Sequence, residues 1–129
     1  LKLNPLKANI RGKRLVVVDD SIVRGTTSAR TVKMLRDAGA SEIHMRISAP
    51  PFKHSCHFGT DIDDEEKLIA NKMSVEEIAK FIGADSLGYI SIEGDKQACS
   101  GCSLGLCTGC FDGNYPMHIG HHKKAEFEC

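Results

Sequence analysis

The chain has 129 residues, and its 17 Lys and Arg residues balance its 17 Asp and Glu residues. A net charge of zero argues against a nucleic-acid module, which needs a basic surface. The length suits one folded domain, and a hydrophobic content of 41% argues against extensive disorder. Apolar runs stay below the roughly 18 residues that span a bilayer, and no secretory leader opens the chain. We therefore expect a cytoplasmic protein that binds neither nucleic acid nor membrane.

The first half of the chain has the pattern of a strand, a helix and a second strand. Residues 14–20 (RLVVVDD) contain a continuous Leu-Val-Val-Val run and end in two acids, which predicts a parallel strand covered on both faces. Helical spacing over residues 26–38, followed by Gly39, predicts a helix. Alternation over residues 42–48 predicts a second strand. Because such units are nearly always parallel and right-handed, we predict an α/β fold.

The second half of the chain predicts shorter elements. An acidic stretch, DIDDEE, suits the positive end of a short helix that continues through Ala70. Ser74 and Glu77 form a capping box for a predicted helix over residues 74–83. Residues 87–92 (LGYISI) favour a short strand.

The last third of the chain changes in composition. Residues 95–113 are rich in Gly, Ser and Cys, which indicates a metal-organised loop. The tail from His118 has no apolar period and is predicted to be mobile. His121 and His122 lie in this tail, and we assign them no role.

The loop over residues 16–28 (VVVDDSIVRGTTS) carries the clearest chemistry. A buried strand delivers Asp19 and Asp20 to the carboxyl edge of a sheet, where ligands of open α/β folds bind. The turn that follows offers backbone N–H groups, a helix N-terminus and adjacent hydroxyls, which together suit a phosphate. The two acids suit sugar hydroxyls or a water-held Mg²⁺. The residues alone favour this site no more than an ordinary loop in which Thr26 caps the helix.

The six cysteines are predicted to be reduced, because they are too sparse for a disulfide scaffold. Cys99 and Cys102 form one C-x₂-C pair, and Cys107 and Cys110 form another. Two such pairs permit a tight zinc knuckle or redox exchange.

The segment DDSIVRGTTS resembles the phosphoribosyl pyrophosphate (PRPP) loop of type I phosphoribosyltransferases, in the variant typical of glutamine PRPP amidotransferases. APPFKHSCHFG, SVEEIAKFIGADSLGYIS and CTGCFDGNYP resemble the same family in the same order, so the resemblance covers roughly residues 1–116. It implies a partial type I phosphoribosyltransferase fold, with a Rossmann-like parallel sheet and a Cys-rich C-terminal loop. Residues 1–94 would be the C-terminal half of that domain, 95–117 a cluster-binding segment and 118–129 the tail.

The resemblance also implies the site residues. Asp19 and Asp20 would contact the ribose hydroxyls and the Mg²⁺ shell, and the residues after them would hold the 5′-phosphate. No catalytic side chain is assigned. The predicted PRPP-binding residues are Asp19, Asp20, Ser21, Ile22, Val23, Arg24, Gly25, Thr26, Thr27 and Ser28.

In the Bacillus-type, iron–sulfur class of this family, four cysteines hold a [4Fe-4S] cluster. Three of them map onto Cys56, Cys107 and Cys110, and the fourth is expected upstream of this chain. Cys99 and Cys102 fall outside that pattern, and the terminal Cys129 is expected to be free.

The resemblance implies transfer of glutamine-derived ammonia to PRPP in the first step of purine biosynthesis. It also implies purine nucleotides as inhibitors and a homotetramer. The chain lacks a glutaminase domain, so we expect it to be inactive alone. The alternatives are a structural zinc module, a PRPP-binding regulator and a salvage phosphoribosyltransferase. The metal separates the zinc module from the amidotransferase, because iron with sulfide favours the amidotransferase and zinc favours the module. Neutral net charge and the lack of a DNA-reading motif argue against the regulator. The salvage enzyme leaves the late C-x₂-C segment unexplained.

Overall fold

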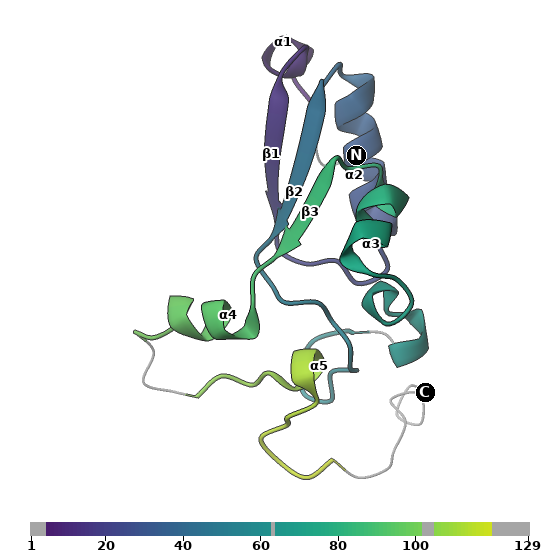
Figure 1. The fold of residues 1–129 in the computed structure, drawn as a ribbon. Coiled ribbons are helices and arrows are strands. Elements are labelled where there is room, and N and C mark those ends of the chain that lie inside the picture. Colours follow the sequence, from purple (N-terminus) through teal and green to yellow (C-terminus); the bar gives the residue numbers. More distant parts are fainter. Residues whose placement is uncertain (1–4, 63, 102–104, 120–129) are drawn as a thin grey trace.

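Three parallel strands form a sheet in the order β1-β2-β3 in the computed structural model, which describes residues 5–62, 64–101 and 105–119 (Figure 1). The strands are β1 (Arg14–Asp19), β2 (Glu42–Ile47) and β3 (Ser86–Tyr89). Asp19 pairs with Ile47, and Ile47 pairs with Tyr89. The carboxyl ends of the three strands therefore meet at one edge, as expected for ligand sites in parallel sheets.

Two helices cover one face of this sheet, α2 (Thr26–Asp37) and α3 (Val75–Ile82) (Figure 1). The core lies between these helices and the strands, and its fully buried members include Val32, Ile43, Met45 and Ile78. The predicted strand, helix and strand unit is confirmed, with boundaries within one residue of those expected. The capping box of α3 is also present, because Ser74 and Glu77 hydrogen-bond each other's backbone N–H groups.

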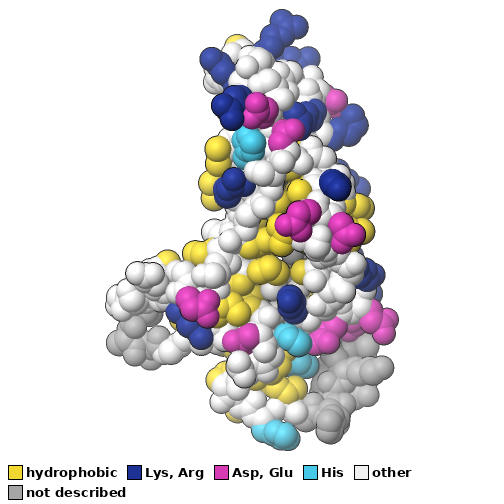
Figure 2. Space-filling view, viewed as in Figure 1, with side chains coloured by type: hydrophobic (Ala, Val, Ile, Leu, Met, Phe, Trp, Pro, Cys, Tyr) yellow, Lys and Arg dark blue, Asp and Glu magenta, His cyan; other side chains and the backbone are white. Residues whose placement is uncertain are grey.

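The other face of the sheet is open among the described residues, and this corrects the prediction for the first strand. Val16 and Val18 of β1 are 68% and 72% exposed, and hydrophobic side chains reach the surface beside the strands in Figure 2. The expectation of cover on both faces was wrong for this chain because both helices that pack on the sheet lie on one side. Apolar residues on both faces of a strand are typical of a sheet that is covered twice.

Short elements complete the described chain. A single turn of helix, α1 (Lys7–Ile10), precedes β1, and two 3₁₀ turns, η1 (Glu65–Lys67) and η2 (Ile69–Asn71), occupy the place of the predicted short helix. Lys and Arg side chains gather around α1, at the end of the molecule opposite the carboxyl ends of the strands (Figures 1 and 2).

The predicted loop over residues 95–113 contains the end of one helix, α4 (Ile92–Ala98), and the whole of another, α5 (Gly109–Asp112). The Ser91 side chain accepts a hydrogen bond of 3.0 Å from the Gly94 N–H and so begins α4. The sequence prediction missed this cap because it placed Ser91 in the strand over residues 87–92, whereas β3 ends at Tyr89 and α4 begins at Ile92. The residues 120–129 of the predicted tail, with His121, His122 and Cys129, lie outside the described residues. In the described ranges, no helix is long and apolar enough to cross a bilayer.

Candidate functional site

The loop between β1 and α2 surrounds a cavity of about 480 Å³ at the carboxyl edge of the sheet. All ten residues that the sequence predicted for PRPP binding line this cavity, together with one further residue, Asp61. The structure therefore brings the predicted residues together around one space. Their contact with a ligand stays a prediction.

The two acids after β1 arrange the start of the loop. The Oδ1 atom of Asp19 accepts a hydrogen bond of 3.0 Å from the Asp20 N–H, and Oδ1 of Asp20 accepts one of 2.8 Å from the Ser21 N–H. The carbonyl oxygen of Asp19 accepts a bond of 3.0 Å from the Ser48 N–H, which fixes the loop to the end of β2. Each carboxylate uses one oxygen in these turns, so its second oxygen can face a cation or a sugar hydroxyl.

The N-terminus of α2, whose residues line the cavity, supplies backbone N–H groups as hydrogen-bond donors. Gly25 precedes the helix in the left-handed conformation, with φ of 79°, and the first N–H that bonds back into the helix is that of Ala29, to the Gly25 carbonyl. The N–H groups of Thr26, Thr27 and Ser28 thus have no partner within the helix, and no side chain caps this end in the described chain. Unpaired N–H groups and the helix dipole make this end suited to an anion.

One hydrogen bond and one hydrophobic contact hold the loop between β1 and α2 in place. The Ile69 N–H donates a hydrogen bond of 3.0 Å to the Val23 carbonyl. The Val23 side chain packs against a buried cluster formed by Phe52, Ile62 and Leu68. Cys56 and Cys110 pack against the same cluster. The loop between β1 and α2 and the cysteine segment, residues 95–117, therefore pack on the same hydrophobic residues.

Asp61 lines the cavity but was missed by the sequence analysis. It belongs to the acidic stretch after β2, which was interpreted only as charge at the start of a helix. No local pattern marks it, because its position beside the loop depends on how the chain between β2 and η1 folds back across the sheet edge.

The cysteine segment is attached to the loop after β2 by three hydrogen bonds. The Cys110 carbonyl accepts bonds of 3.0 and 3.1 Å from the N–H groups of Lys53 and His54. The Tyr115 hydroxyl donates a bond of 2.6 Å to the Ser55 carbonyl. These bonds place α5 beside the segment that carries Cys56.

The thiols in this region have opposite pKa shifts. At Cys56, burial acts to raise the pKa, but hydrogen bonds from the backbone of Gly59, Phe58 and Thr60 outweigh it and lower the pKa to about 7. At Cys110, burial and the nearby charges of Cys56 and Cys107 raise the pKa to about 11. A metal stabilises the thiolate form of its ligands, so these values describe the free thiols.

The structure brings the three predicted cluster ligands into one region without forming a complete metal site. Within residues 5–62, 64–101 and 105–119, no three or more His, Cys, Asp or Glu side chains are already assembled as a metal site. Cys99 is exposed at the end of α4, which points away from α5 (Figure 1). Cys102 lies outside the described residues.

A parallel sheet with two acids after its first strand, and free backbone N–H groups at the start of its first crossover helix, is the arrangement expected of a type I phosphoribosyltransferase domain. The comparisons with known proteins are more specific, although no family model matches. The chain is homologous to amidophosphoribosyltransferases. It is 53% identical over 124 residues to the Synechococcus elongatus protein and 53% identical over 120 residues to the Methanothermobacter thermautotrophicus protein. These matches cover 96% and 92% of this chain.

A solved structure gives the same result. The glutamine PRPP amidotransferase from B. subtilis, complexed with ADP and GMP, matches with a TM-score of 0.81 and 48% identity over 90% of this chain. The chain covers 26% of that structure and 25% of the two sequence relatives. It therefore spans about a quarter of the proteins it resembles.

Proposed function

We propose that this chain is the PRPP-binding part of an amidophosphoribosyltransferase, which transfers ammonia from glutamine to PRPP and forms 5-phosphoribosylamine. The observation that carries this proposal is the cavity lined by the ten loop residues. The homology to amidophosphoribosyltransferases supports it over a regulator or a salvage enzyme. Because the chain spans a quarter of its relatives, the activity requires the longer protein.

The proposed binding mode follows from the donors and acceptors of the loop. The 5′-phosphate would accept hydrogen bonds from the N–H groups at the start of α2 and from the hydroxyls of Thr26, Thr27 and Ser28. The Asp19 and Asp20 carboxylates would face the ribose hydroxyls and a hydrated Mg²⁺, since oxygen ligands suit this ion. Bound Mg²⁺ would neutralise charge on the pyrophosphate group.

The loop would act by position and charge. It fixes the phosphate at one end of the ribose and the two acids beside its hydroxyls, which orients the anomeric carbon toward incoming ammonia. Carboxylates close to the ring would stabilise the positive charge that develops as pyrophosphate leaves. Ammonia is already a nucleophile, so we assign no general base among the loop residues.

We further propose that Cys56, Cys107 and Cys110 are ligands of a [4Fe-4S] cluster whose fourth ligand lies upstream of this chain. Their chemistry fits this group, because thiolates are its usual ligands and backbone N–H groups already donate to the Cys56 sulfur. The reaction has no redox step, so the cluster would join the loop after β2 to α5 and stabilise both.

The proposed partners are PRPP, glutamine-derived ammonia, purine nucleotides as inhibitors, and further copies of the chain in a homotetramer. ADP and GMP in the similar B. subtilis structure support the nucleotide proposal. Free thiols suit a reducing compartment, which we propose to be the cytoplasm; the plant relatives that match are chloroplastic proteins.

A substitution at Asp19 tests the PRPP site. Asp19→Asn keeps the oxygen that accepts from the Asp20 N–H but removes the charge. We expect Mg²⁺-dependent PRPP affinity of the full-length protein, measured by calorimetry, to fall by at least about tenfold. Asp37→Asn is the control, because it makes the same change at the opposite end of α2. Equal PRPP affinity of Asp19→Asn and wild type would show that Asp19 only forms the turn.

Metal analysis tests the cysteine site. Iron and acid-labile sulfide of about four each per full-length chain, after anaerobic purification, would support the cluster. Zinc without sulfide would instead support a structural zinc site and would leave the PRPP proposal to stand on the loop alone.

A further inference from the structure

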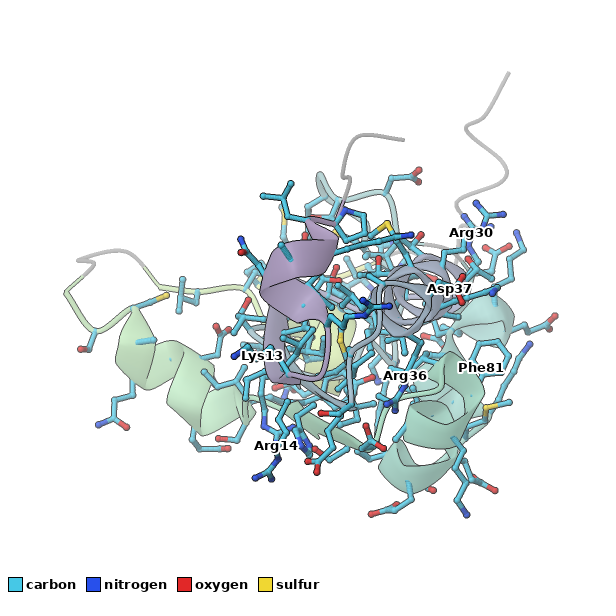
Figure 3. All side chains as sticks on the ribbon, turned by 90° about the horizontal axis from the view of Figure 1, so that it is seen from above. Lys13, Arg14, Arg30, Arg36, Asp37 and Phe81 are labelled. Carbon is cyan, nitrogen blue, oxygen red and sulfur yellow. The ribbon has the colours of Figure 1, made fainter. Side chains whose placement is uncertain are left out.

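Phe81 is a large aromatic residue of α3 whose side chain is about half exposed to solvent. Its side chain is 48% exposed, whereas Ile78, Ala79 and Ile82 of the same helix are buried in the core. In Figure 3, Phe81 lies on the side of the molecule formed by α2 and α3, away from α4. The ring is therefore outside the core that holds α3 against the sheet.

The ring of Phe81 packs against Gly25, which belongs to the loop between β1 and α2 that we propose binds the phosphate. A Cβ atom added to Gly25 would lie 3.1 Å from Cε1 and 3.3 Å from Cδ1 of Phe81. The absence of a side chain at this position is what permits the close approach. The ring thus covers the backbone at the residue that immediately precedes α2.

Ile69 holds the same stretch of backbone from η2. Its Cδ1 atom would lie 2.9 Å from the added Cβ of Gly25, and its N–H donates to the Val23 carbonyl. Ile69 and Phe81, which lie before and after the turn at Lys72, therefore both contact the loop. Ile69 contacts it through its backbone N–H and its side chain, and Phe81 contacts it through its ring.

Both contacts come from regular elements of the fold. Phe81 lies in the last turn of α3, at the opposite end from the Ser74 cap, and Gly83 ends the helix in the left-handed conformation. Ile69 is only 4% exposed and belongs to the main core. A side chain held by such elements can fix a loop more firmly than a second loop can.

We propose that Phe81 is a positioning residue for PRPP: it holds the backbone at Gly25 so that the N–H groups of Thr26, Thr27 and Ser28 converge on the 5′-phosphate before the ligand arrives. This inference rests on the proposed function. Holding a loop in its bound conformation lowers the ordering cost of binding. Phe81 is not among the residues that line the cavity, so we expect its effect to lie on substrate affinity.

The test uses Phe81→Ala in the full-length protein, with PRPP and Mg²⁺ as the probe. We expect KM and the calorimetric Kd for PRPP to rise about tenfold while kcat stays within about twofold. Phe81→Leu, which restores apolar bulk at Gly25, should recover most of the affinity. Ser74→Ala is the matched control, since it weakens the cap of α3 but leaves the ring in place; its melting temperature should fall while its KM stays at the wild-type value.

The outcomes separate this inference from the proposed function. If wild type binds PRPP and Asp19→Asn does not, an unchanged KM in Phe81→Ala overturns the positioning role alone. An equal rise in KM for Ser74→Ala and Phe81→Ala also overturns it, because helix stability would then explain both. A wild-type protein without affinity for PRPP overturns the proposed function and this inference with it.

Discussion

Asp85 and Arg36 form an ion pair of 2.6 Å that joins the start of β3 to the last turn of α2. The same Asp85 oxygen accepts a hydrogen bond of 2.6 Å from the Ile43 N–H at the start of β2. One carboxylate thus connects two strands and a helix at the amino ends of the strands, at the opposite end of the sheet from the loop between β1 and α2.

This carboxylate predicts an acid-sensitive contribution to folding. The Ile43 N–H first, and the Arg36 guanidinium second, hold the pKa of Asp85 below its usual value of 3.8. A group whose pKa is lowered by folding contributes stability that is complete above the unfolded value and is lost as pH falls through the folded value. We expect Asp85→Asn to melt below wild type near neutral pH, and the difference to shrink as the pH falls below 3.8.

Asp37→Asn is a suitable control for this measurement. Asp37 pairs with Lys33 along the surface of α2, and both side chains are well exposed, so the pair contributes little. Its melting temperature should follow wild type at every pH. A difference for Asp85→Asn that persists unchanged in acid would contradict the ionic explanation.

Gly25 predicts a combined effect on the loop and on stability. Gly25→Ala places a side chain at a left-handed residue, which costs about 1–2 kcal/mol, and forces it against Ile69 and Phe81. We expect a lower melting temperature and a loss of PRPP binding of at least about tenfold, since the donors at the start of α2 must move. Both are measurable in the full-length protein by calorimetry.

Gly12 provides the control for backbone conformation. It is also left-handed, with φ of 71°, but an added Cβ would meet nothing within 4 Å. Gly12→Ala should therefore show the conformational cost alone and bind PRPP normally. Equal stability losses and intact PRPP binding in both variants would show that the packing around Gly25 is not needed.

Most of the strands and helices could be predicted because the sequence signal for each lies within a short stretch of the chain. The apolar run of β1, the helical spacing of α2 and the capping box of α3 each lie within a few consecutive residues. The cap of α4 at Ser91 is local as well, but it was missed because residues 87–92 were interpreted as a strand and residues 95–113 as a loop.

The site was predictable only in part, for the same reason. The ten loop residues are contiguous, so one motif identified all of them. Asp61, Ile69 and Phe81 reach the loop from later parts of the chain, and no spacing rule connects them to Gly25. Their place follows from how the chain returns across the end of the sheet, which is a property of tertiary packing.

The different pKa values of the Cys56 and Cys110 thiols predict the order in which they are alkylated once any metal has been removed by a chelator. Hydrogen bonds from the backbone outweigh burial and lower the pKa of Cys56 to about 7, while burial raises that of Cys110 to about 11. Only thiolates react rapidly with alkylating agents. Peptide mass spectrometry after brief iodoacetamide treatment near neutral pH should find Cys56 modified well before Cys110. Faster alkylation of Cys110 would show that the two segments separate when the metal leaves.

Two tyrosines allow the hydrogen bond behind the cysteine segment to be measured. The Tyr115 hydroxyl donates to the Ser55 carbonyl, so Tyr115→Phe leaves that carbonyl without this donor and should cost about 1 kcal/mol. The Tyr89 hydroxyl is buried and has no hydrogen-bond partner among the described residues. Tyr89→Phe removes a polar group that burial disfavours, so its free energy of unfolding should be unchanged or higher.

Urea unfolding of the two variants, compared with wild type in the same buffer, gives both free energies. We also expect Tyr115→Phe to lose the iron of the proposed cluster faster to a chelator, because the Tyr115 hydrogen bond holds the C-terminal side of α5 against the segment of Cys56. A loss of stability in Tyr89→Phe as large as that in Tyr115→Phe would mean that the Tyr89 hydroxyl has a partner in the longer protein. Equal rates of metal loss in Tyr115→Phe and wild type would mean that the Tyr115 bond does not hold the cysteines together.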